Sequence, residues 1–267
     1  MASATFRFYD GLNDFLARAR RGAEFTVPCA QNATVKHMIE ALGVPHTEVA
    51  LVLVNGVSGA LERLLEEGDR VAVYPRFSSL DPGALQCLPA QLPLQPPGRL
   101  RFVADAHLGA LARLLRMAGF DTIYANTIHD DEIEERAMEE GRIVLTRDRE
   151  LLKRRGVAYG CYVRALRPPA QLREVAERYD LAERARPFTL CLHCNLPLRA
   201  VSLVALSPAA QEGLPPAVRA SQTTFSLCDG CHGVFWKGSH WRRMAGMLES
   251  ALPHHGDPDD LGLRRED

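Results

Sequence analysis

The sequence predicts an α/β protein built around a parallel sheet, with a smaller α+β domain before it and a cysteine-rich segment after it. Apolar strands alternate with helices between residues 100 and 152, which is typical of parallel sheets. Residues 5–74 follow the order strand, strand, helix, strand, strand, and two CxxC pairs occur after residue 190. At 267 residues the chain exceeds a typical domain of about 150 residues, so we expect two or three units.

Residues 1–77 are expected to form the first domain. Thr34 is typical of a helix N-cap, and Gly43 marks the end of the same helix. Asn55-Gly56 is a strong signal for a tight turn. Strands are predicted at residues 5–9, 25–27, 50–54 and 71–74.

The rest of the chain divides by composition. A proline-rich stretch is typical of a semi-rigid linker, and the last residues are polar. We therefore expect a linker at residues 78–98 and an α/β domain at residues 99–187. A cysteine-rich domain at residues 188–250 and a polar tail at residues 251–267 should follow.

An acidic residue follows each of the three strands predicted at residues 100–104, 120–125 and 143–145. The strand at residues 100–104 ends at Asp105, and the strand at residues 143–145 leads through Thr146 and Arg147 to Asp148. Between them, Asp130 is expected to be the N-cap of a helix that Gly141 ends. Because parallel pairing brings these strand-to-helix junctions to one edge of the sheet, we expect the three acids to be neighbours.

Three carboxylates at one edge repel each other unless a cation lies between them, and oxygen ligands suit Mg²⁺ or Mn²⁺. Such a site predicts metal-assisted hydrolysis of phosphodiesters. Arg147, next to Asp148, is the residue that we expect to contact phosphate. It belongs to a basic cluster that also contains Arg142, Arg149, Lys153, Arg154 and Arg155.

The segments RFVADAHLGALARLLRMAGFDT, DDEIEERA and GRIVLTRDRELL, followed by a CxxC pair and CDGCHGVFWKGSHW, resemble the PIN-like Mut-seven carboxy-terminal ribonuclease family with its zinc ribbon. The resemblance covers roughly residues 99–247 and implies a metal-dependent nuclease of PIN-like fold. Asp105, Asp130 and Asp148 match the acidic positions. Asp131 and Glu134 are alternatives for the middle acid.

The first domain, with VALVLVNG and EGDRVAVYP, resembles the ubiquitin-like β-grasp domains of the sulfur-carrier type, which the Mut-seven group has at this position. Carriers need a free terminal Gly-Gly, whereas the single Gly83 is followed by the rest of the chain. We therefore expect this domain to have a structural role or to dock a protein partner.

The two CxxC pairs predict a structural zinc site. Four thiolates fill a tetrahedral shell and leave no open position for chemistry. Residues 207–221, between the pairs, are expected to form a flexible loop. The other cysteines are expected to be plain thiols. The predicted ligands are Cys191, Cys194, Cys228 and Cys231.

The net charge of −1 gives no overall attraction to nucleic acid, so a basic patch would have to be local. No apolar run approaches the roughly 20 residues of a membrane span, and the first residues do not resemble a signal peptide. We expect a cytoplasmic protein with no membrane contact. The favoured function is a ribonuclease acting on RNA. The alternative is a non-catalytic RNA- or ribosome-binding protein with the same fold.

Overall fold

A computed structural model describes residues 2–75 and 95–252, so most of the predicted linker and the polar tail from residue 253 lie outside the described residues. The chain divides into two compact units. The first contains Met1–His107 and Thr127–Tyr162, and the second contains Leu108–Asn126 and Val163–Asp267.

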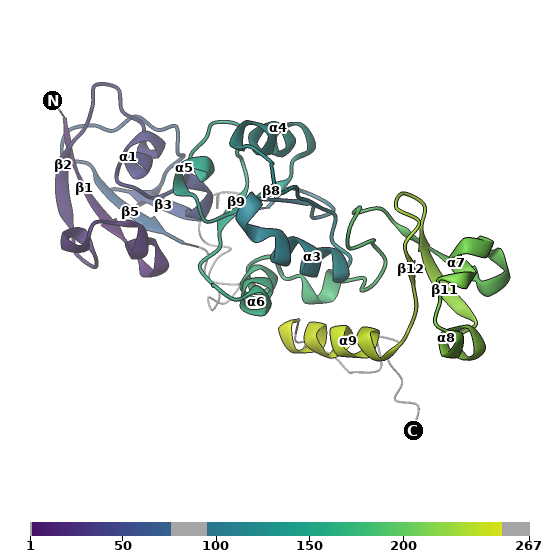
Figure 1. The fold of residues 1–267 in the computed structure, drawn as a ribbon. Helices are drawn as coiled ribbons and strands as arrows, with labels where there is room; N and C mark the ends of the chain where they lie inside the picture. Colours follow the sequence, from purple (N-terminus) through teal and green to yellow (C-terminus); the bar gives the residue numbers. More distant parts are fainter. Residues whose placement is uncertain (1, 76–94, 253–267) are drawn as a thin grey trace. The chain divides into compact units, whose positions relative to one another are not determined.

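The amino-terminal part of the first unit is a β-grasp domain, as predicted. Its sheet has the order β2-β1-β5-β3-β4, in which β1 and β5 are parallel and the other pairs are antiparallel. Figure 1 shows α1 beside this sheet. The elements are β1 (Ser3–Phe8), β2 (Phe25–Pro28), α1 (Val35–Ala41), β3 (Leu51–Val54), β4 (Val57–Ser58) and β5 (Arg70–Tyr74).

Local signals in the sequence explain these elements. Thr34 caps α1 by accepting a hydrogen bond from the His37 amide at 3.1 Å. Asn55 and Gly56, between β3 and β4, both have positive φ, at 54° and 80°, which a tight hairpin turn requires. Both predictions are confirmed.

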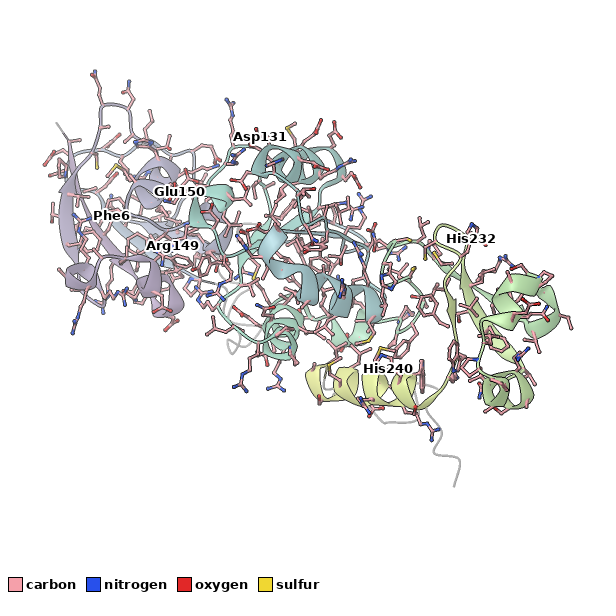
Figure 2. All side chains as sticks on the ribbon, viewed as in Figure 1. Phe6, Asp131, Arg149, Glu150, His232 and His240 are labelled. Carbon is pink, nitrogen blue, oxygen red and sulfur yellow. The ribbon has the colours of Figure 1, made fainter. Side chains whose placement is uncertain are left out.

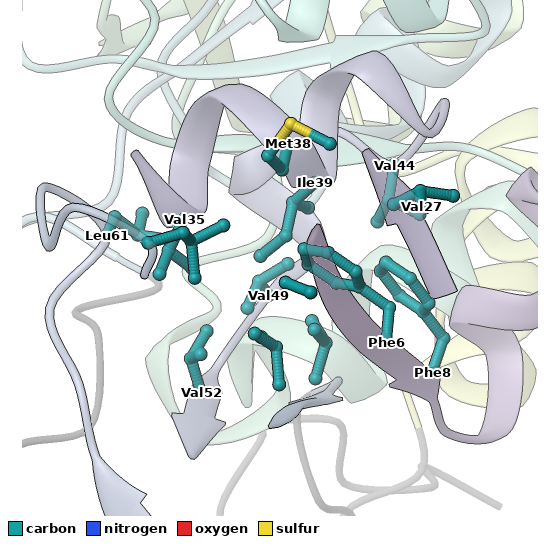
Figure 3. Packing of buried hydrophobic residues seen from close by; sticks show 14 of the residues in the cluster. Phe6, Phe8, Val27, Val35, Met38, Ile39, Val44, Val49, Val52 and Leu61 are labelled. Atoms are coloured by element: carbon teal, nitrogen blue, oxygen red, sulfur yellow. The ribbon is translucent and has the colours of Figure 1, made fainter. Parts of the chain in front are cut away.

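The core of this domain lies between the sheet and α1. Figure 3 shows Phe6 and Phe8 of β1 packed near Ile39 of α1. Phe6 and Ile39 are completely buried. Burial of such side chains stabilises the fold by about 1.5–3 kcal/mol each.

The first unit also contains a parallel sheet. Strand β8 (Ile143–Thr146) lies between β6 (Phe102–Ala104) and β9 (Gly160–Tyr162), with Val144 opposite Val103 and Gly160. Helix α4 (Asp130–Glu140) precedes β8 and ends at Gly141, whose φ of 61° is left-handed. Helix α5 (Arg149–Leu152) follows β8. The parallel α/β prediction is confirmed.

The β-grasp domain contacts β9 within this unit. The Glu48 carboxylate accepts a hydrogen bond from the Tyr162 amide at 2.8 Å. His46 Nε2 lies 2.9 Å from the Val157 carbonyl oxygen, and the Phe15 and Tyr162 rings meet edge to face at 5.2 Å. The two domains therefore share an interface with polar and aromatic contacts.

The second unit contains α3 (Gly109–Met117), β7 (Thr122–Ile123), α6 (Pro168–Tyr179) and a three-stranded antiparallel sheet with the order β10-β11-β12. The elements of the cysteine-rich part are β10 (Leu198–Ser202), α7 (Pro208–Glu212), α8 (Pro216–Ser221), β11 (Thr224–Cys228), β12 (Val234–Phe235) and α9 (Ser239–Ala251). Short 3-10 helices occur at Asp10–Phe15, Arg18–Arg20, His46–Glu48, Ala106–Leu108, Ala182–Arg184 and Leu203–Ala205.

Two local predictions were wrong. Asp130 is the first residue of α4, and His129 is its N-cap without a side-chain cap bond. The expected flexible loop at residues 207–221 contains α7 and α8. Ser207 caps α7 by accepting from the Ala210 amide at 3.2 Å, and a proline begins each helix.

Across the part of the chain that the structure describes, no helix combines the length and apolar character that a membrane span requires.

Candidate functional site

A hydrogen-bonded link joins the ends of β6 and β8. Asp105 follows β6, and its carboxylate Oδ2 accepts a hydrogen bond from the Thr146 hydroxyl at 2.6 Å. Asp105 is 9% exposed and Thr146 is completely buried. The same hydroxyl oxygen accepts a hydrogen bond from the Asp148 amide at 2.9 Å. Thr146 therefore fixes the Asp105 carboxylate and the backbone of Asp148 together.

The side chain of Asp148 caps α5. Its Oδ1 accepts a hydrogen bond from the Glu150 amide at 2.8 Å, and the residue is exposed. Figure 2 labels Arg149 and Glu150 on this short helix. Asp148 thus has a structural contact that uses one of its carboxylate oxygens.

Arg154 pairs with the acids of α4. Its guanidinium lies 3.1 Å from the Glu134 carboxylate and 3.6 Å from that of Asp130, and it also donates a hydrogen bond to Asp131. Asp131, labelled in Figure 2, is 92% exposed at its side chain. This guanidinium holds the pKa of the Asp131 carboxyl below its usual range.

Glu134 has a second structural contact, because its Oε1 accepts a hydrogen bond from the Gly156 amide at 2.8 Å. A Cβ added at Gly156 would lie 2.7 Å from Glu134 Cγ, so the backbone approaches this side chain closely. Glu134 thus anchors the segment that follows α5.

A cavity of about 440 Å³ lies at these junctions in the first unit. It brings together Asp105, Asp130 and Asp131 with the cation of Arg154. Asp148, Arg147 and Glu134 do not line it. The remaining lining residues are Ala106, His107, Ile128 and His129.

The carboxylates are oxygen donors, which suit Mg²⁺ or Mn²⁺. Among the described residues, however, the four cysteines are the one group of three or more potential ligands whose donor atoms all lie within 4.8 Å of each other. In this arrangement Arg154 provides the positive charge next to Asp130 and Asp131.

Most of the predicted basic cluster has protein partners. Arg142 is buried and bonds Glu140 and the Phe102 carbonyl, and Lys153 pairs with Glu150 at 2.7 Å. Arg147 is exposed and lies next to Asp148 in sequence.

Arg149 belongs to the interface with the β-grasp domain. It lies over the Phe15 and Tyr162 rings, at 5.0 and 5.6 Å from their centroids, and donates a hydrogen bond to the Phe15 carbonyl. In the sequence, Arg149 and Arg154 look like the other members of the cluster, because their partners are distant in the chain.

The four predicted cysteine ligands come together in the second unit. Their sulfur atoms all lie within 4.8 Å of each other, and the Cys191 and Cys231 sulfurs are 3.7 Å apart. With zinc–sulfur bonds of about 2.3 Å, a tetrahedral site has sulfur–sulfur edges of about 3.8 Å. The four cysteines could therefore bind a structural zinc ion.

The pKa values of these thiols diverge. Hydrogen bonding to Cys231 raises the pKa of Cys194 to about 12. Burial acts to raise the pKa of Cys228, but the amide groups of Cys231 and Gly230 donate to its sulfur and lower the pKa to about 7. Backbone donors around a sulfur favour the thiolate, which is the form that binds zinc.

The first cysteine pair is anchored to the end of α3. Arg116 is 5% exposed, and its guanidinium donates hydrogen bonds to the carbonyl oxygens of Leu192 and His193 at 3.1 and 2.9 Å. Asn195 accepts from the Thr122 amide at 3.0 Å and donates to Asp121. Folding of the cysteine site is therefore linked to the α3–β7 segment.

Comparison with known families covers most of the chain. A model described as the Mut7-C RNAse domain matches residues 100–248. A model described as Mut7-C ubiquitin matches residues 1–81. Both matches confirm the resemblances drawn from the sequence.

Two crystal structures of small archaeal modifier protein 1 from Haloferax volcanii are similar to part of the chain. Their sequences are 23% and 24% identical to this chain. Each match covers 29% of this chain, and it covers 100% and 99% of the two modifier proteins. The TM-score is 0.24 in both cases. No match was found among curated proteins.

Proposed function

Because the chain belongs to the Mut7-C RNAse domain family, we propose that it is a metal-dependent ribonuclease that hydrolyses RNA phosphodiester bonds at Asp105, Asp130 and Asp148. The observation that carries this proposal is the buried Asp105 carboxylate, fixed by Thr146 and lining the same cavity as Asp130 and Arg154. Hydrogen-bonded, preorganised carboxylates next to a cation are typical of phosphoryl-transfer sites.

The carboxylates of Asp105, Asp130 and Asp148 would hold Mg²⁺ or Mn²⁺. When bound, such an ion neutralises phosphate charge and lowers the pKa of a coordinated water. Asp105 contributes a fixed acceptor, since Thr146 occupies its Oδ2. Asp148 does not line the cavity and would contribute through its second oxygen, because Oδ1 caps α5.

Asp130 is the middle acid of this proposal. It lines the cavity together with Asp105, whereas Glu134 bonds the Gly156 amide and does not line it. Asp131 also lines the cavity, but its side chain is 92% exposed, so water screens its charge.

Two arginines bind the substrate phosphate. Arg147 follows Thr146 directly and is exposed. Arg154 is one-third exposed at the cavity, and its guanidinium would be available to phosphate if a metal ion took over the charge of the acids. A zinc ion held by the four cysteines would be structural, and the β-grasp domain docks a protein partner.

One observation favours the alternative, a non-catalytic RNA- or ribosome-binding platform. Arg154 already pairs with three acids of α4, so these carboxylates have a cation beside them without a metal ion. This alternative keeps RNA as the partner but assigns no reaction to the acids.

The test is cleavage of labelled single-stranded and structured RNA by the full chain with Mg²⁺, Mn²⁺ or no added divalent ion. Asp105→Asn keeps the shape of the side chain and removes its charge, so cleavage should fall about 100-fold or more. Glu132→Gln is the matched control, because it removes an exposed charge from the first turn of α4 outside the cavity.

An Asp105→Asn protein that cleaves like the parent would exclude the carboxylate site. A parent that binds RNA but cleaves none with either metal would favour the platform.

A further inference from the structure

A second, larger cavity lies within the second unit. Its volume is about 880 Å³, within the range of about 300–1,000 Å³ that is usual for ligand sites. It extends between the antiparallel sheet and α9, and it shares no lining residue with the cavity of the proposed active site. The chain contains two tryptophans, Trp236 and Trp241, and both line this groove.

The aromatic side chains of the groove are only partly covered. Trp236, Trp241 and Phe188 are all half-buried, so part of each ring faces solvent or the cavity. The Phe188 and Trp241 rings are tilted by 40° with centroids 5.0 Å apart, which fixes the position of Trp241. The groove therefore has aromatic surfaces that a planar group could stack on.

Positive charge borders these rings. The Lys237 ammonium lies 5.3 Å from the centre of the Trp241 ring and is exposed. Arg242 and Arg243, also exposed, follow Trp241 in the first turns of α9, where Figure 2 labels His240, but they do not line the groove themselves. Residues 237–243 contain no acid, and Glu249 is the acidic residue that lines the groove.

We propose that this groove binds single-stranded RNA by stacking bases on Trp236 and Trp241 while Lys237 and its neighbouring arginines contact the phosphates. Aromatic rings beside cations match the alternating flat bases and anionic phosphates of a single strand. A neutral apolar peptide would gain from the aromatic rings but not from the one-sided charge. The choice of RNA rests on the proposed ribonuclease function, but the groove is a separate site.

The experiment uses the full chain carrying Asp105→Asn, without added Mg²⁺ or Mn²⁺, so that RNA is not cleaved and zinc is retained. Because both tryptophans lie in the groove, intrinsic fluorescence reports this site directly. Titration with single-stranded oligoadenylate should quench the fluorescence saturably, whereas a duplex RNA of equal length should quench it weakly, because its bases are already stacked.

Substitutions then separate stacking from charge, with affinity measured by the anisotropy of labelled oligoadenylate. Trp241→Ala should weaken binding about 10-fold or more, and Trp241→Phe should restore most of it. Lys237→Ala should reduce the slope of log affinity against log salt by about 0.7, the value for one phosphate contact on a single strand. Arg219→Ala removes one exposed charge from α8 outside the groove and should leave the slope unchanged.

Unchanged affinity in a folded Trp241→Ala protein would overturn the proposal, as would equal effects of Lys237→Ala and Arg219→Ala. Lys237 is exposed, so its variant tests the groove even if Trp241→Ala does not fold. If the groove mediates self-association or binds a peptide, and oligoadenylate does not compete with that binding, the groove is a protein-binding site. This result would also overturn the proposal. If the parent cleaves no RNA but the groove binds it, the ribonuclease proposal fails and the groove remains.

Discussion

Thr146→Val tests whether the buried hydroxyl between β6 and β8 supports the proposed site. The substitution keeps the shape of the side chain but removes the donor to Asp105 and the acceptor for the Asp148 amide. A hydrogen bond to a charged group contributes about 1.5–3 kcal/mol, and a bond between neutral groups about 0.5–1.5 kcal/mol. Because Thr146 is completely buried, water cannot replace the lost contacts, and we expect a loss of about 2–4 kcal/mol.

The chain has several units, so global unfolding would mix their transitions. Native-state hydrogen exchange of the β6 and β8 amides follows this sheet separately. A loss of about 2–4 kcal/mol corresponds to opening about 30- to 900-fold more often. Thr146→Ser is the control, since it keeps the hydroxyl and loses one buried methyl, at a cost of about 1 kcal/mol. RNA cleavage should fall more in Thr146→Val than in Thr146→Ser, because only the valine variant removes the hydroxyl that anchors both Asp105 and Asp148.

Exchange rates and cleavage of Thr146→Val equal to those of Thr146→Ser would refute this reasoning. They would mean that the link between Asp105 and Asp148 supports neither the sheet nor the site.

Three further predictions follow from named contacts. Arg154→Ala should raise the pKa of Asp131 toward its usual value, which NMR titration of the carboxyl group measures, and should weaken RNA cleavage. An unchanged pKa of Asp131 would exclude this ion pair in solution. Metal analysis of the parent should give one zinc ion per chain, and Cys191→Ser or Cys228→Ser should remove it and unfold the cysteine-rich region, because such sites contribute on the order of 10 kcal/mol; a folded parent without zinc would contradict this. Arg149→Met keeps an apolar stem but loses the hydrogen bond to Phe15 and the charge over two rings. It should destabilise the β-grasp interface by about 1–3 kcal/mol, measured by hydrogen exchange of the β9 amides. Arg155→Met, at an exposed position, is the control and should leave this exchange unchanged.

The local features of the fold were predictable from the sequence. Thr34 as a cap, the Asn55-Gly56 turn, Gly141 at the end of α4 and the spacing of the cysteine pairs all depend on residues a few positions apart. The alternation of strands and helices also predicted that acids follow β6 and β8 at one sheet edge. These signals act at short range, so neighbouring residues contain the information.

The partners of the polar side chains were decided by tertiary structure. Thr146 bonds Asp105 across 41 positions, Arg154 pairs with acids of α4, and Arg149 contacts the β-grasp domain instead of a substrate. The groove around Trp236 and Trp241 likewise needs the sheet and α9 together. A charge in the sequence has many candidate partners, and the packed fold brings one within the few ångströms where a hydrogen bond or ion pair contributes.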